Sequence, residues 1–329
     1  MSATTETEIN QSQQSFMMRF NLRDNLRNAG TFIGLLIIFA FFATQSPIFL
    51  TEANLINILQ QSAINACIAI GMTLVIISGG IDLSVGPTAA VAAVFTATFM
   101  FDGMAVIPAV LLGLGIGVLC GVFNGVLIAR AGLQPFIMTL GTLSLYRAIA
   151  LIYTGGNPIL SVPAEFRAFF TGRVGSIPVP VILVGVVAIV AWIVLRKTPL
   201  GEYLLAVGGN EEAARVSGVP VARTKITAYA ISGFLAALAA LILVGRLGAA
   251  EPILGNLWEL DAIAAAAIGG ASLMGGKGSI IGTLMGAVIL GAMRNGLTLM
   301  NVQAFYQLFA TGAIIILAML VDRVTRGRE

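Results

Sequence analysis

Apolar residues fall into long, closely spaced runs separated by short polar stretches, which is the pattern of helices that cross a membrane. A helix needs about 20 mostly apolar residues to cross a hydrocarbon core about 30 Å thick. The pattern predicts ten spans, at 29–49, 56–78, 84–100, 104–129, 135–153, 178–195, 226–247, 260–273, 280–299 and 305–321. The run at 260–273 is short and rich in alanine, so it could instead be a broken or re-entrant helix buried among its neighbours.

Composition places the chain outside the soluble class. Hydrophobic residues make up 58% and charged residues 10% of the 329 residues, whereas soluble domains contain roughly 25% charged residues. We therefore expect an all-α, polytopic transmembrane helix bundle with one domain at 29–322. Residues 1–28 are rich in Ser, Gln, Thr and Glu, which predicts a disordered tail because such a segment cannot bury a core. Residues 323–329 form a short basic tail.

The distribution of positive charge predicts the orientation of the bundle. With the N-terminus in the cytoplasm, most of the 18 Lys and Arg residues fall in loops on the cytoplasmic side. Cytoplasmic loops of membrane proteins are enriched in these two residues. We therefore expect an even number of crossings, with both terminal tails in the cytoplasm of a multi-pass membrane protein.

A polar insertion at 196–225 interrupts the apolar runs. Its residues 208–218 read Gly-Gly-Asn-Glu-Glu-Ala-Ala-Arg-Val-Ser-Gly. Alanines and paired charges bounded by glycine and proline predict a short charged helix. The predicted orientation puts this segment in the cytoplasm, where a soluble partner could bind it. The alternative is an ordinary solvated loop.

Glycines recur every four residues in the fourth predicted span, at Gly113, Gly117, Gly121 and Gly125. This spacing places all four on one helix face. Small residues at such spacing let two helices approach closely, and close packing is a main source of helix association in lipid. We therefore expect this face to contact another helix, and the shorter repeat of Gly282 and Gly286 to do the same in the ninth span.

The chain offers little for catalysis. The loop at 275–279 lacks the glycine and the Ser or Thr that a P-loop needs around Lys277, and no other segment resembles an ATP-binding motif. There is no histidine, and Cys67 and Cys120 lie singly within apolar runs. We expect no catalytic residue, no metal site, no cofactor of its own and no nucleic-acid partner.

Polar groups at membrane depth are better functional candidates. Asp82 lies in a glycine-flanked break between two apolar runs, and a carboxylate inside a bilayer costs about 2.5–3.5 kcal/mol on insertion scales. Either Asp82 or Ser84 could cap the third span, or both could line a pathway for a neutral polyhydroxyl solute. The pathway candidates are Asn65, Asp82, Ser84, Asn124, Phe136, Thr139 and Thr142. Hydrogen bonds between helices would leave the same pattern in the sequence.

Four motifs together closely resemble the ribose-type sugar permeases of bacterial ATP-binding-cassette importers. They are Gly-Gly-Ile-Asp-Leu-Ser-Val-Gly at 79–86, Phe-Ile-Met-Thr-Leu-Gly-Thr at 136–142 with Tyr-Thr-Gly-Gly at 153–156, Gly-Gly-Asn-Glu-Glu-Ala-Ala-Arg at 208–215, and Gly-Gly-Ala-Ser-Leu-Met-Gly-Gly-Lys-Gly-Ser at 269–279. The likeness covers about 54–322. It implies a ten-span permease of the bacterial cytoplasmic (inner) membrane that pairs with a second permease copy, of the same or another chain.

The resemblance also implies partners and site residues. In such importers a Glu-Ala-Ala-x3-Gly segment docks on a cytoplasmic ATPase, which binds the ATP and Mg²⁺, and an extracytoplasmic binding protein delivers the sugar. The implied ATPase-coupling residues are Asn210, Glu211, Glu212, Ala213, Ala214, Arg215 and Gly218. For docking of the binding protein on the outer face, the candidates are Asn157, Glu165, Arg167, Arg173, Arg246 and Glu251.

Other functions remain open at this stage. Permeases for branched-chain amino acids share a similar architecture. A proton- or sodium-coupled sugar transporter would need titratable groups along its route, and the spans offer only Asp82, Arg147, Asp261 and Arg294. A third alternative is an export or scaffold protein without a transport cycle of its own.

Overall fold

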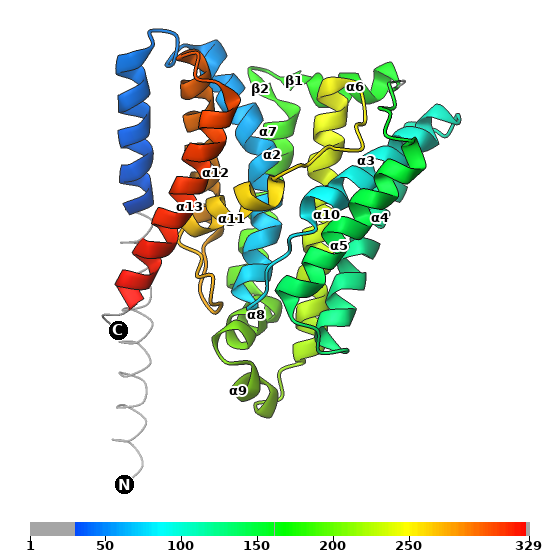
Figure 1. Cartoon of the computed structure of the whole chain (residues 1–329), viewed down its shortest axis with the longest axis vertical. Coiled ribbons are helices and arrows are strands. Elements are labelled where there is room, and N and C mark those ends of the chain that lie inside the picture. Colours follow the sequence, from blue (N-terminus) through cyan, green and yellow to red (C-terminus); the bar gives the residue numbers. More distant parts are fainter. Residues whose placement is uncertain (1–29, 161, 327–329) are drawn as a thin grey trace.

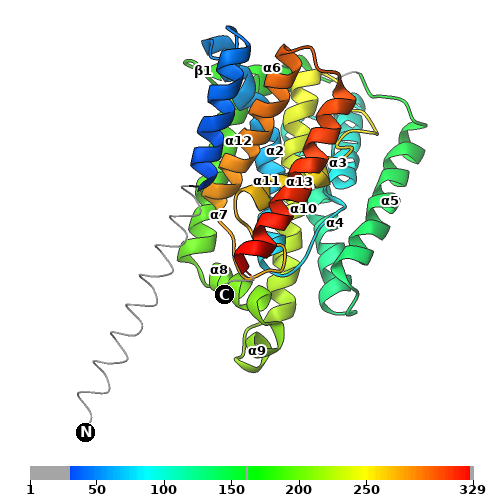
Figure 2. The same ribbon diagram turned by 60° about the vertical axis from the view of Figure 1, so that its left-hand side comes forward.

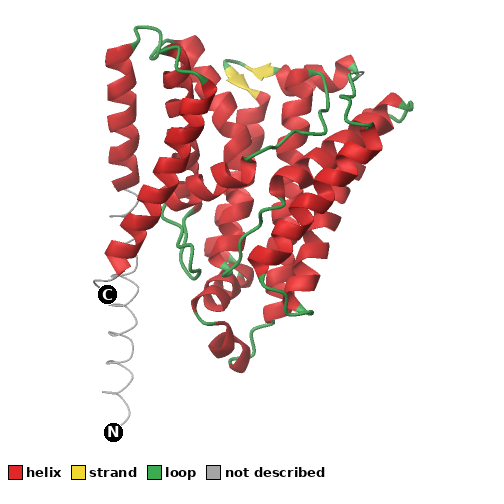
Figure 3. Ribbon diagram, in the orientation of Figure 1, coloured by secondary structure: helices red, strands yellow, loops and turns green. Residues whose placement is uncertain are grey.

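The computed structural model describes residues 30–160 and 162–326. Helices account for almost all of the regular structure in this part of the chain (Figure 3). The one exception is a two-stranded antiparallel hairpin, β1 (Arg173–Val174) and β2 (Ile177–Pro178). The helical class predicted from the apolar runs is therefore confirmed.

The apolar helices follow the predicted runs to within a few residues at most ends. They are Gly30–Gln45, α2 (Glu52–Ile77), α3 (Val85–Phe101), α4 (Val106–Ala129), α5 (Pro135–Thr154), α7 (Val179–Lys197), α10 (Val221–Leu247), α11 (Trp258–Ile268), α12 (Ile280–Leu299) and α13 (Ala304–Arg326). Six of them, α2, α4, α5, α7, α10 and α12, are long and apolar enough to cross a membrane by length and composition. With its 11 residues, α11 rises only about 16 Å, which fits a broken or re-entrant helix better than a full span.

The short elements lie at two opposite ends of the bundle. Helix α6 (Ala164–Thr171) and the hairpin occupy one end, and α8 (Pro199–Gly209) and α9 (Glu211–Val216) occupy the other. Figures 1 and 2 both show α9 protruding beyond the long helices. The helix Gly30–Gln45 runs away from the α9 end, and α13 runs back towards it (Figure 1).

The predicted glycine face of α4 packs against α10 and α3. All four glycines are buried. A Cβ atom on Gly117 would overlap the carbonyl oxygen of Gly233, and one on Gly121 would overlap that of Tyr229, whereas one on Gly113 would overlap the Thr96 hydroxyl of α3. The two main chains thus approach as closely as glycine permits, and the predicted helix contact is confirmed. Gly286 packs in the same way against the Ala265 main chain of α11.

Two non-helical segments enter the bundle, 79–84 after α2 and 251–257 before α11. Helices α3 and α11 consequently begin partway through the bundle (Figure 1). Their N-terminal ends meet through Gly86 and Gly255, where a Cβ atom on Gly255 would lie 2.6 Å from the Gly86 carbonyl oxygen. Non-helical backbone at membrane depth is tolerated where protein surrounds it or where it lines a cavity. We call 79–84 the first break and 251–257 the second break.

Candidate functional site

The protruding helix α9 has strong local determinants. The Asn210 side chain occupies the N-cap and its Oδ1 atom accepts a hydrogen bond of 2.9 Å from the main-chain N–H of Ala213. Two glutamates in the first turn and Arg215 in the last turn complement the helix dipole. Gly218 follows with a φ of +83°, a conformation that favours glycine after a helix end. The predicted short charged helix is therefore present.

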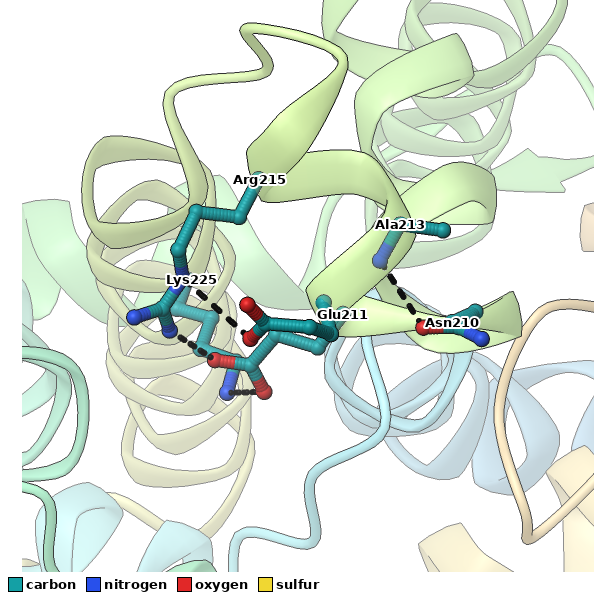
Figure 4. Close-up of polar contacts among 6 residues, drawn as sticks. Asn210, Glu211, Ala213, Arg215 and Lys225 are labelled. Atoms are coloured by element: carbon teal, nitrogen blue, oxygen red, sulfur yellow. Dashed lines mark hydrogen bonds and ion pairs between the residues drawn. The ribbon is translucent and has the colours of Figure 1, made fainter.

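Glu211 ties α9 to the first turns of α10. Its carboxylate accepts a hydrogen bond of 2.5 Å from Lys225 Nζ and one of 3.1 Å from Arg215 (Figure 4). Burial raises the pKa of Glu211, but the hydrogen bonds and positive charges of Lys225 and Arg215 outweigh it, so the pKa is lower than usual. The carboxylate is therefore ionised at neutral pH, and the ion pair with the mostly buried Lys225 is intact.

The other side of α9 is open. The Glu212 side chain is 78% exposed, and Val216 is 82% exposed. Ala214 lies on the opposite face, buried in a small cluster with Val207 and Val221. Helix α9 thus exposes a charged and partly apolar face, while its opposite face packs against the bundle. This arrangement suits binding of a protein partner, because covering the Val216 side chain would remove apolar surface from water.

The first break is held by a buried network of hydrogen bonds. Asp82 Oδ1 accepts bonds from the main-chain N–H (3.1 Å) and the hydroxyl (2.6 Å) of Ser84, and Oδ2 accepts one of 2.9 Å from Ser232 of α10. Asn124 of α4 donates to the Ser84 hydroxyl at 2.8 Å, and Tyr146 of α5 donates to Asn124 Oδ1 at 3.3 Å. The break is thereby bonded to three helices.

Asp82 and Ser84 were the two predicted caps of α3, but neither side chain caps this helix in the structure. Ser84 does occupy the N-cap position, and Gly86 and Pro87 lie in the first turn, but no side-chain capping bond forms. The Ser84 hydroxyl donates to Asp82 instead. The carboxylate therefore secures the break itself, because it accepts from the N–H and hydroxyl of the same serine.

Four of the seven pathway candidates form hydrogen bonds at this break. Asp82, Ser84 and Asn124 share the network, and Thr139 donates a bond of 3.1 Å from α5 to the Ile81 carbonyl. Thr142 lies one turn further along α5 and bonds within that helix. The other two are elsewhere, since Asn65 is half-buried on α2 and Phe136 is 49% exposed at the start of α5.

Charged side chains lie near the second break, and the sequence pattern alone points to only some of them. Arg147 of α5 donates from Nη1 to the carbonyl oxygens of Pro252 (2.6 Å) and Leu254 (2.8 Å). In α11, Asp261 pairs with Arg294 of α12. Glu259, which was missed because it precedes the predicted eighth span, is buried in the first turn of α11 and interacts electrostatically with Arg147. A charged donor, Arg147, thus bonds to the second break, whereas the donors to Asp82 at the first break are neutral.

The candidates for docking a binding protein all lie at the end opposite α9. Each of the six is exposed: Asn157, Glu165, Arg167, Arg173, Arg246 and Glu251. They come from α6, the hairpin, the end of α10 and the adjoining loops, which the chain brings to one end (Figure 1). A bridge between Ile159 and Ala250 joins two of these loops. Among the described residues, no group of three His, Cys, Asp or Glu side chains is placed to hold a metal ion.

Comparisons with known proteins identify relatives of the whole chain. Residues 54–319 match the family model described as branched-chain amino acid transport system / permease component. The chain is 43% identical to the ribose import permease protein RbsC of Bacillus subtilis (strain 168), over 97% of this chain and 98% of that protein. It is 45% identical to RbsC of Escherichia coli (strain K12), over 88% and 92%. It is also 40% identical to the D-allose transport system permease protein AlsC of the same strain, over 90% and 91%. No solved structure matches.

Proposed function

The chain belongs to the family of branched-chain amino acid transport system permease components, and we propose that it is the membrane subunit of an ATP-binding-cassette importer for a monosaccharide. In this role it forms the route for the sugar and hydrolyses nothing itself, because ATP and Mg²⁺ bind to a separate ATPase. Its place is the bacterial cytoplasmic (inner) membrane, with both termini and α9 on the cytoplasmic side. We further propose that the chain crosses the membrane ten times and pairs with a second permease copy.

The observation that carries this proposal is α9, a capped and anchored helix that exposes Glu212 and Val216 at one end of the bundle. An ATPase bound to this face can move it as a rigid body, since Lys225 holds the helix to α10 and the Asn210 cap fixes its first turn. A tenfold accumulation of sugar requires about 1.4 kcal/mol, so one coupled ATPase partner is an adequate source of energy. The coupling residues named from the sequence fit this role.

Sugar is favoured over a branched-chain amino acid by the relatives, although the family model is described for amino acids. The polar groups at the first break are chemically consistent with this choice. Ser84, Asn124 and Thr139 carry uncharged hydroxyls and an amide, which match the hydroxyls of a sugar. The carboxylate beside them, Asp82, already accepts hydrogen bonds from Ser84 and Ser232. Ribose is the substrate to test first, because it is named for the relatives at 43–45% identity.

We place the translocation route beside the two breaks and the receiving surface for a sugar-binding protein at the opposite end from α9. Half-helix ends and irregular backbone at membrane depth form the substrate sites of many transporters. Arg167, Arg173 and Glu165 supply exposed charges of both signs at the outer end. Such rim charges steer association and set register more than they add affinity.

Reconstitution tests the proposal. The chain, a candidate ATPase and a candidate sugar-binding protein from the same organism would be assembled in proteoliposomes. Uptake of labelled ribose, allose and leucine would then be compared with and without ATP. We expect ATP-dependent uptake of a sugar that requires the ATPase and the binding protein. Uptake of leucine alone would favour the amino-acid alternative, and uptake driven by a proton gradient without the ATPase would overturn the proposal.

A further inference from the structure

Three segments that are distant in the sequence meet just behind α9. They are the last turn of α8, the last turn of α2 and the loop 270–279 that joins α11 to α12. The main-chain N–H of Gly276 in this loop donates a hydrogen bond of 2.9 Å to the carbonyl oxygen of Ile77, the last residue of α2. The loop is thus attached directly to the end of α2.

Gly208 lies between these two segments, where there is no room for a side chain. A Cβ atom at this position would overlap the Ile77 carbonyl oxygen and lie 2.6 Å from the Gly276 nitrogen, the two atoms of that hydrogen bond. From the other side, a Cβ atom on Gly275 would lie 2.6 Å from the Gly208 carbonyl oxygen, and Gly275 itself has a φ of +90°. Main chains of all three segments are therefore in contact without any intervening side chain.

The junction lies between the docking helix and both breaks. Gly208 precedes Asn210, the cap of α9, by two residues, and Ile77 precedes Gly79, where the first break begins, by two residues. The loop 270–279 follows α11, whose other end begins at the second break. A displacement of α8 at Gly208 therefore acts at once on the end of α2 and on the loop, because close-packed main chains cannot absorb it.

We infer that this contact of Gly208 with Ile77 and Gly276 is the junction through which movement of α9 reaches the two breaks. Gly208 is on this view a positioning residue for transport, which acts without touching ATP or sugar. The Lys225–Glu211 ion pair supplies a separate link from α9 to α10. This inference rests on the proposed function, since it assumes that an ATPase moves α9.

The neighbouring glycine provides a matched control. A Cβ atom on Gly209 meets nothing within 4 Å, and both glycines belong to α8, where alanine is the better helix former. Gly208→Ala and Gly209→Ala thus differ in the contact with α2 and the loop. The variants would be compared for the amount of complex with the ATPase, the ATP hydrolysed by that complex, and the sugar taken up by proteoliposomes.

We expect Gly208→Ala to lower sugar uptake per ATP hydrolysed by about tenfold, whereas Gly209→Ala stays within about twofold of the unchanged chain. A merely structural defect would lower the amount of complex, ATP hydrolysis and uptake together, and leave their ratio unaltered. An unaltered ratio in Gly208→Ala would overturn the inference. If the unchanged chain binds no ATPase, the proposed function itself fails, and this outcome is separate from any result with the variants.

A second pair of variants covers the case in which Gly208→Ala does not fold. A Cβ atom on Gly278, in the same loop, would lie 2.6 Å from both Cγ1 and Cδ1 of Ile77. We expect Gly278→Ala alone to lower the ratio of sugar uptake to ATP hydrolysis. Ile77→Ala removes the two overlapping atoms, so the double variant Gly278→Ala/Ile77→Ala should recover this ratio. Failure of the double variant to recover, with the complex intact, would contradict a junction at the end of α2.

Discussion

Asp82 is an acid at membrane depth that accepts its hydrogen bonds from neutral groups. Its two oxygens accept three bonds, from Ser84 and Ser232. Only 1% of the residue is exposed, and buried polar groups are stabilising only when they are fully hydrogen-bonded. Asp82 thereby joins the first break to α10 through Ser232, and its partner Ser84 joins the break to α4 through Asn124.

Replacing this carboxylate should therefore weaken the fold. Asp82→Ala leaves the hydroxyls of Ser84 and Ser232 without their acceptor, and each buried group left unpaired costs about 1–3 kcal/mol. The expected result is a lower midpoint of thermal unfolding in detergent. Asp102→Ala, at the exposed end of α3, serves as the control and should leave the midpoint unchanged. Equal midpoints for the two variants would show that the network contributes no stability.

The pKa of Glu211 makes a second residue-level prediction. Lys225 and Arg215 lower this pKa in the folded protein. The ion pair therefore contributes its full stability to α9 at any pH above the ordinary glutamate pKa of about 4.3. This contribution is lost as the pH falls through the lowered pKa of the folded state. The difference in thermal midpoint between the unchanged chain and Glu211→Gln should be constant from pH 8 to 6, within measurement error, and shrink in acid. A difference that changes between pH 8 and 6 would exclude this ion pair as its source.

At the scale of elements, the contact between α4 and α10 depends on the absence of side chains. Gly117→Ala would bring a Cβ atom onto the Gly233 carbonyl oxygen, while Gly115 on another face of α4 has nothing within 4 Å. Overpacking of this kind costs about 1–3 kcal/mol. Gly117→Ala should therefore lower the thermal midpoint, and Gly115→Ala should not. The same result in both variants would mean that α4 moves freely away from α10.

The apolar runs predict the helices well because the period and length of apolar segments decide helix formation in a membrane. Four-residue glycine spacing likewise predicted a close helix contact, and the Asn-Glu-Glu-Ala-Ala run predicted α9. No predicted span corresponds to helix α6 or the small hairpin, because both are too short to leave a long apolar run in the sequence. The entry of the two breaks into the bundle depends on distant partners, such as Arg147 with the Pro252 carbonyl, and no local pattern specifies such contacts.

At the scale of the whole molecule, the two ends of the bundle should face opposite compartments. Val216 on α9 is 82% exposed, and Glu165 on α6 is exposed at the other end. With Cys120→Ala as background, because Cys67 is buried, an impermeant maleimide should label Glu165→Cys from outside and Val216→Cys only in inverted vesicles. Labelling of both from the same side would contradict the proposed orientation.

The central claim is that α9 joins the bundle to an ATPase, and one binding measurement tests it. The chain would be purified with candidate ATPases from the same organism, and the complex quantified for the unchanged chain, Glu212→Lys and Glu165→Lys. Glu212 is 78% exposed and makes only a 4.0 Å contact with Arg215, so reversing its charge should leave the fold intact. We predict a complex with the unchanged chain and with Glu165→Lys, and none with Glu212→Lys. A complex that survives Glu212→Lys undiminished would contradict docking through this face.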